Sequence, residues 1–172
     1  KNLRTRHWQI RGDDTGWMVL EDERQPEDGD EAHAALHRYN GVTWSVVSSL
    51  DALDISGMWV DQDGNPWLTA NGALVRHDGK VTVRLPVPEA FAPTVITGTN
   101  ARDVWFFGPA KQVYQWDGER LRGGEAPFDV GGAWAAPNGE VWITGRWDYD
   151  TGQSAAPVGV VARTAALPEV KQ

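Results

Sequence analysis

The sequence predicts an all-β fold, a β-propeller of four four-stranded antiparallel blades that form one unit over residues 1–172. Two observations carry this prediction. A turn followed by a Trp-bearing strand occurs four times along the chain. Three copies also contain an Asn-Gly or Asp-Gly turn, at Gly41, Gly79 and Gly118, which are 38 and 39 residues apart. That spacing is close to the length of one blade, and no long helical pattern competes with it.

The Trp residues after the turns, called the anchors here, are Trp17, Trp67, Trp105 and Trp142. Their predicted strands cover 17–20, 67–70, 104–107 and 141–144. Eight or nine residues before each anchor lies a second position that we expect to face inward, namely Trp8, Trp59, Thr97 and Trp134. A single meander exposes both of its faces, so packing between neighbouring blades accounts for the ten Trp residues. A ligand-binding role for the repeated Trp set is the alternative.

The second half of each copy contains two further strands around the Gly turn. Asn-Gly and Asp-Gly favour tight hairpin turns because both residues tolerate a positive φ. The closing strands are predicted at 42–47, 80–85 and 119–122. In the fourth copy, Thr164 and Ala165 stand where the turn is expected. The predicted blades cover roughly 5–47, 54–87, 94–126 and 130–170.

Two stretches resemble known bacterial propeller repeats. The stretch MWVDQDGNPWLTANGALVRHDGK, 58–80, resembles the two-component regulator propeller repeat. The stretch DVWFFGPAKQVYQWDG, 103–118, is similar to the DVWAVG/HWDG-type repeats of large bacterial surface and secreted proteins. This resemblance implies rings of about six to eight blades used for binding and sensing, and a secreted, periplasmic or cell-surface location. Virginiamycin B lyase, which shares the architecture, is an enzyme.

Composition excludes several classes of function. The net charge of -8 argues against nucleic acid as a partner, because phosphate binding needs a basic face. No stretch approaches the roughly 20 apolar residues of a membrane span. The absence of Cys rules out a disulfide framework, a thiolate metal site and a Cys nucleophile.

Two copies carry insertions between their second and third strands. The anchor lies 12 residues before the turn Gly in blade two and 13 in blade three, but 24 in blade one. Blade four carries an insertion over 147–158. Such loops share one rim of a propeller, so we predict that this rim binds a protein or glycan partner. The predicted contact residues are Glu21, Asp22, Glu23, Glu27, Asp28, Asp30, Glu31, Trp147, Asp148, Tyr149 and Asp150. The alternative for 21–31 is a solubilising acidic loop.

One turn has the alternating acids of a calcium loop. Asp61, Asp63 and Asn65 are the candidate metal ligands, although the distal Glu of an EF-hand is missing. A plain turn is the alternative, and no other cofactor is expected. The four His residues lack metal-site spacing.

The sequence therefore favours a non-enzymatic recognition or scaffolding module. One alternative is a propeller lyase or glycan hydrolase with a central-channel site that uses His77 or carboxylates. Another is the sensor domain of a larger receptor. We favour a partial ring completed by further blades or a second chain over a closed four-bladed ring, because no outer strand precedes the first copy to latch a ring shut.

Overall fold

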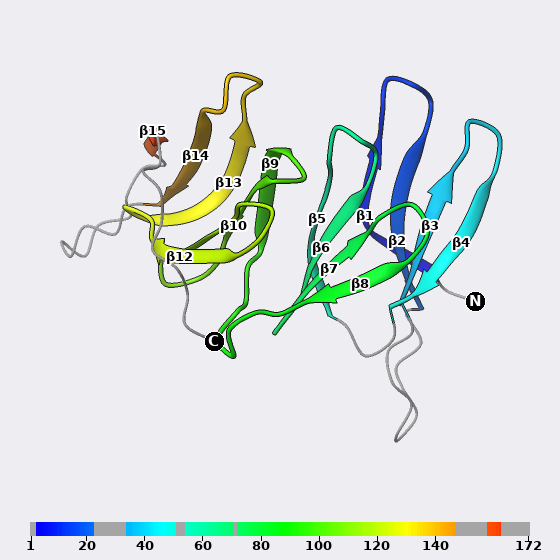
Figure 1. The fold of residues 1–172 in the computed structure, drawn as a ribbon, viewed down its shortest axis with the longest axis horizontal. Helices are drawn as coiled ribbons and strands as arrows, with labels where there is room; N and C mark the ends of the chain where they lie inside the picture. Colours follow the sequence, from blue (N-terminus) through cyan, green and yellow to red (C-terminus); the bar gives the residue numbers. More distant parts are fainter. Residues whose placement is uncertain (1–2, 23–33, 51–53, 71, 147–157, 163–172) are drawn as a thin grey trace.

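The computed structural model describes residues 3–22, 34–50, 54–70, 72–146 and 158–162 (Figure 1). These residues form four antiparallel sheets, three with four strands and one with three, and contain no helix. In each sheet, strands that follow one another in the chain are hydrogen-bonded neighbours. The prediction of an all-β fold made of antiparallel propeller blades is confirmed.

Each blade runs through its strands in chain order. Blade one contains β1 (Leu3–Ile10), β2 (Gly16–Asp22), β3 (Ala34–Tyr39) and β4 (Trp44–Ser49). Blade two contains β5 (Ile55–Val60), β6 (Pro66–Ala70), β7 (Ala73–His77) and β8 (Thr82–Leu85). Blade three contains β9 (Val95–Asn100), β10 (Asp103–Phe107), β11 (Gln112–Trp116) and β12 (Leu121–Glu125). Blade four contains β13 (Asp129–Ala135), β14 (Val141–Arg146) and β15 (Val158–Ala162), and its expected turn at Thr164 lies outside the described residues.

The predicted Gly turns are confirmed between the third and fourth strands of blades one to three. Gly41, Gly79 and Gly118 have φ values of 92°, 88° and 98°, which an L side chain rarely adopts. Before Gly79, one carboxylate oxygen of Asp78 accepts the backbone N–H groups of Lys80 and Val81. Asn40 and Asp117 shape their turns in the same way.

The blades stand side by side in an open array. Their first strands, β1, β5, β9 and β13, are neighbours in that order. Figure 1 shows blade one and blade four at opposite ends, so four blades do not close a ring here. The strands that flank the two predicted insertions, β2 and β3 in blade one and β14 and β15 in blade four, therefore lie at opposite ends of the array.

The core lies between the blades, and the anchors of blades one to three occupy equivalent places in it. Trp17 packs in the cluster that joins blade one to blade two. Trp67 lies in the cluster between blades two and three, and Trp105 lies in the cluster between blades three and four. Each of these three anchors thus faces the next blade along the chain.

One sequence equivalence was wrong by a single residue. Gln9, not Trp8, pairs with Trp17, as Trp59 pairs with Trp67. Trp8 pairs with Met18 and lies on the opposite face of blade one. Because side chains alternate along a strand, a shift of one residue reverses the face that a side chain covers.

Hydrogen bonds between first strands fix the blade-to-blade register. The Gln9 side-chain carbonyl accepts the backbone N–H of Val60 at 3.0 Å. The Thr97 hydroxyl accepts the backbone N–H of Ala135 at 3.1 Å. Gln9 and Thr97 both pair with an anchor, so the same bond recurs at the first and third blade boundaries.

Candidate functional site

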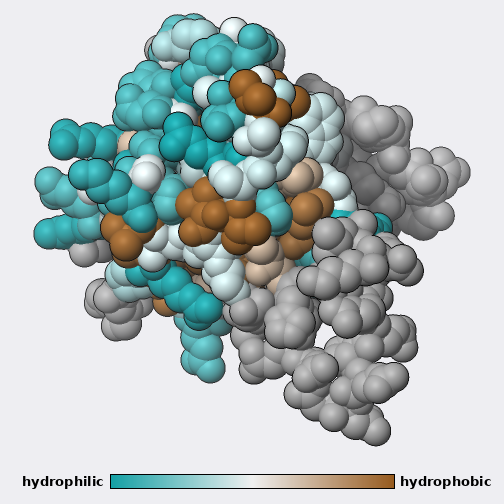
Figure 2. Space-filling model, turned by 90° about the vertical axis from the view of Figure 1, so that its right-hand side faces the viewer, coloured by the Kyte–Doolittle hydropathy of each residue, from teal (hydrophilic) through white to brown (hydrophobic). Residues whose placement is uncertain are grey.

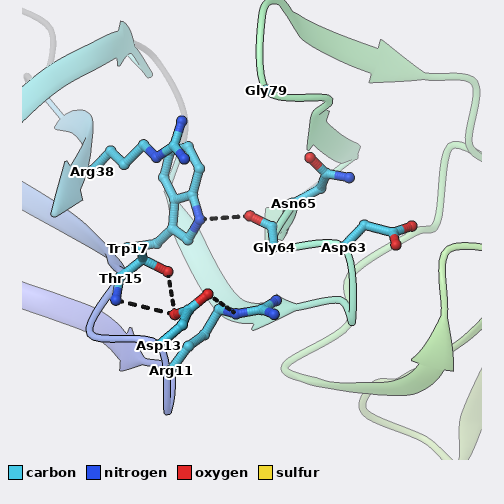
Figure 3. A pocket seen from close by; sticks show the side chains of 9 residues that line it. All are labelled: Arg11, Asp13, Thr15, Trp17, Arg38, Asp63, Gly64, Asn65 and Gly79. Carbon is cyan, nitrogen blue, oxygen red and sulfur yellow. Dashed lines mark hydrogen bonds and ion pairs between the residues drawn. The ribbon is translucent and has the colours of Figure 1, made fainter. Parts of the chain in front are cut away.

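A polar pocket of about 190 Å³ lies at the boundary between blades one and two. It opens on the edge formed by the turns between first and second and between third and fourth strands, which we call the turn rim. Residues from both blades line it: Arg11, Asp13, Thr15, Trp17, Arg38, Asp63, Gly64, Asn65 and Gly79 (Figure 3).

Bonds across the blade boundary hold the pocket walls together. The Trp17 indole N–H donates to the Gly64 carbonyl at 2.8 Å. The Arg11 guanidinium donates to the Asp61 and Gln62 carbonyls at 2.8 and 3.0 Å. Arg11 therefore serves as a structural link between the two turns.

The buried carboxylate of Asp61 stabilises the turn between β5 and β6. One oxygen of Asp61 accepts the backbone N–H groups of Asp63 and Asn65, and the other accepts the Trp67 indole N–H at 3.3 Å. Asp61 thus acts as a cap for its own turn. The described part of the chain contains no group of three or more His, Cys, Asp or Glu side chains that could hold a metal ion. Calcium binding by Asp61, Asp63 and Asn65 stays a prediction of the sequence.

A second carboxylate stabilises the facing turn. Asp13 accepts the backbone N–H of Thr15 at 3.1 Å and its hydroxyl at 2.6 Å. The side-chain hydrogen bond from Thr15, followed by the backbone bond, lowers the pKa of Asp13. This carboxylate is therefore ionised at neutral pH, and it lies 3.6 Å from the Arg11 guanidinium.

Three polar side chains border the pocket with hydrogen-bonding capacity to spare. Figure 3 shows Arg38 above Trp17 on one wall and Asp63 and Asn65 on the other. The Arg38 guanidinium lies 5.6 Å from the Trp17 ring centroid. Within the described residues, the side chains of Arg38, Asp63 and Asn65 form no hydrogen bond or ion pair. The pocket thus offers planar N–H donors on one side and oxygen acceptors on the other.

The structure places His77 away from any central channel. His77 lies on the third strand of blade two, whereas first strands line the inner edge of a propeller. Its ring is buried, makes an edge contact with Trp17 at 5.2 Å, and lies 3.1 Å from the Thr82 hydroxyl. Burial lowers the pKa of His77. A propeller enzyme that uses His77 or carboxylates in a central site stays a prediction of the sequence, and the structure places His77 on a third strand, not a first one.

Most of the predicted partner-binding residues lie outside the described part of the chain. These are Glu23, Glu27, Asp28, Asp30, Glu31, Trp147, Asp148, Tyr149 and Asp150, and only the backbone of Asp22 is described. Glu21 forms an ion pair with Arg6 at 2.6 Å across β1 and β2. Since Asp22 ends β2, this loop leaves from the edge opposite the turn rim, which we call the loop rim.

The repeat itself carries a sequence signal for one wall of the pocket, separate from the insertions. Arg38 and Arg76 both stand three residues before a turn Gly, and both stack on an anchor, at 5.6 and 5.1 Å. Arg76 has a buried, unpaired Nε, whereas Arg38 is exposed at the pocket mouth. The repeat thus predicts the stacking, and the position in the array decides which arginine is accessible.

No helix in the described residues is long and apolar enough to cross a membrane. No protein family model matches the chain, and no curated protein matches it.

Among solved structures, the chain is similar to one described as "YCF48 bound to D1 peptide", with 13% sequence identity and a TM-score of 0.48. The alignment covers 81% of this chain and 59% of that chain, so this chain spans less than two thirds of the solved one. At that level the likeness transfers no site residue.

Proposed function

We propose that this array is a recognition module that binds a partner protein through a peptide segment seated in the pocket at the turn rim. The observation that carries the proposal is the set of three side chains, Arg38, Asp63 and Asn65, that border the pocket with unused hydrogen-bonding capacity. Rigid walls suit this role, since the bonds from Trp17 and Arg11 across the blade boundary fix the facing turns.

The chemistry of the pocket favours a segment that carries a carboxylate. A guanidinium stacked on an indole keeps its N–H donors oriented toward a planar anion. Asp63 and Asn65 would accept amide N–H groups of the same segment. The described residues that line this pocket all come from the turn rim of blades one and two.

Two matched peptide libraries test the proposal, one with Glu and one with Gln fixed at a central position. We expect the Glu library to yield binders, and Arg38→Ala to weaken their binding roughly 10- to 150-fold, as the loss of about 1.5–3 kcal/mol predicts. Arg84→Ala is the matched control, since Arg84 is exposed on β8 and does not line the pocket. Equal binding from both libraries, or unchanged binding by Arg38→Ala, would contradict the proposal.

The loop rim stays a separate prediction with its own test. Deletion of residues 22–31 should abolish capture of a protein or glycan if that acidic stretch makes the contact. Peptide binding in the pocket should be unaffected by the deletion, so the two binding surfaces can be told apart.

A further inference from the structure

The two ends of the array expose large apolar side chains on sheet faces that have no neighbour among the described residues. At the blade-four end, Trp134 and Trp142 are 58% and 42% exposed. At the blade-one end, Trp8 and Val46 are 66% and 65% exposed, and Ile10 and Trp44 are also exposed. We call these the trailing face and the leading face.

The trailing face repeats a surface that the chain buries elsewhere. Trp134 pairs with the anchor Trp142 just as Trp59 pairs with Trp67. Trp67 is completely buried by blade three. Ile143, next to Trp142, packs toward blade three, so alternation turns Trp142 toward the position of a following blade.

The leading face repeats the complementary surface. Trp8, Met18, His37 and Val46 form one cross-strand row. The equivalent row in blade two contains Met58, Leu68 and Val75, which pack against blade one. Figure 2 looks onto the blade-one end and shows hydrophobic side chains gathered in the middle of the face, with hydrophilic ones above and to the left.

We propose that a second copy of this chain covers both faces, with the trailing face of each copy packed on the leading face of the other. The two open faces are the halves of an interface that the chain already builds three times between its own blades. Two identical head-to-tail contacts close a two-fold ring. Eight blades lie within the usual range of about four to eight.

The register of the contact follows from the hydrogen bonds between first strands. Thr97 accepts the N–H of Ala135 in the next blade, and Gln9 accepts the N–H of Val60. Trp134 occupies the position of Gln9 and Thr97, since each of the three pairs with an anchor. In the proposed contact, Trp134 of one copy would therefore lie over Ile10 of the other. A Trp already covers the equivalent place at the second boundary, where the Trp59 ring lies over Gly98.

Sedimentation equilibrium of the 172-residue chain tests the proposal. We expect a mass of twice 18.9 kDa. Trp8→Asp and Trp142→Asp should each weaken the dimer roughly 30-fold or more. Val81→Asp, a matched change at an exposed Val of blade two, should leave the mass unchanged. Circular dichroism melting of each variant confirms that it is folded.

Mixing the two variants tests the polarity of the contact. Trp8→Asp keeps an intact trailing face and Trp142→Asp keeps an intact leading face, so an equimolar mixture should form a heterodimer through one interface. A monomeric wild type, a ladder of larger oligomers, a Trp142→Asp variant that still dimerises alone or a mixture that stays monomeric would each overturn the head-to-tail ring. None of these outcomes depends on the peptide pocket, because neither Trp8 nor Trp142 lines it.

Discussion

The interior boundaries of the array and its two ends are built from the same residues in different surroundings. Trp17, Trp67 and Trp105 are 3%, 0% and 3% exposed, whereas the equivalent Trp142 is 42% exposed. All four stand in the same place on a second strand. The difference shows that the repeat specifies which face an anchor occupies, and the neighbouring blade determines whether that face is buried.

The largest expected difference in unfolding free energy is between Trp17→Ala and Trp142→Ala. Both are made in the Trp8→Asp background, because Trp8→Asp removes self-association. Trp17→Ala should lower the free energy of unfolding by about 3–5 kcal/mol, because it opens a cavity at a closed boundary. Trp142→Ala should lower it by less, about 1–2 kcal/mol, since 42% of that residue's surface is already exposed to water and no described blade packs over it. Urea denaturation measures both, and equal losses would contradict the assignment of Trp142 to an open face.

Gly98 tests how tightly the middle boundary is packed. A Cβ there would lie 2.6 Å from the Asp103 carbonyl oxygen and 2.9 Å from the Trp59 ring. Gly98→Ala should therefore cost about 1–3 kcal/mol of unfolding free energy. Gly131→Ala in blade four is the control, because its nearest neighbour would be the Thr144 carbonyl oxygen at 3.9 Å. A melting temperature unchanged by Gly98→Ala would mean that the Asp103 carbonyl and the Trp59 ring do not pack against Gly98 as closely as described.

The hydrogen bond from the Ala135 N–H to the Thr97 hydroxyl should contribute to the unfolding free energy an amount comparable to, or smaller than, the loss expected for Gly98→Ala. Thr97→Val keeps the shape of the side chain and removes the acceptor of the Ala135 N–H, which should cost about 1–3 kcal/mol. Thr144→Val, at an exposed position of blade four, should change stability by no more than about 0.5 kcal/mol. Similar denaturation midpoints for the two variants would show that this bond does not hold blades three and four together.

The smallest effect expected is a dependence of stability on pH. Burial lowers the pKa of His77 below 6.5, so the unfolded chain binds more protons than the folded chain near that pH. Stability should be full above pH 6.5 and fall as the pH drops below it. His77→Phe preserves a ring beside Trp17 and should flatten this slope. In the Trp8→Asp background, which leaves the leading face uncovered, His37→Phe should flatten it less, because His37 is less buried than His77. Denaturation midpoints across this pH range distinguish the two.

Local signals made the blades predictable. Asn-Gly and Asp-Gly turns and turn-Trp strands depend on backbone preferences within a few residues, so Gly41, Gly79 and Gly118 were placed correctly. The face on which Trp8 lies was predicted wrongly. Trp8 stands nine residues before its anchor, whereas Trp59, Thr97 and Trp134 stand eight before theirs. The face on which a side chain lies depends on that single residue.

The pocket was not predictable from any one repeat. Its walls come from blade one, with Arg38, and from the following blade's turn, with Asp63 and Asn65. Which residues of adjacent blades meet depends on how the blades dock, through contacts such as Arg11 with the Asp61 carbonyl. The sequence predicted binding at the loop rim because two copies are longer than the others between their second and third strands. The pocket at the turn rim lies between turns of ordinary length, so no length difference indicates it.

Electron microscopy of the wild-type assembly tests the central claim most directly, namely that the open ends are two halves of one blade-to-blade interface. The head-to-tail arrangement predicts class averages of a closed eight-bladed ring with two-fold symmetry. Four-bladed closed rings, separate open arrays, or pairs of arrays joined through two leading faces would contradict it.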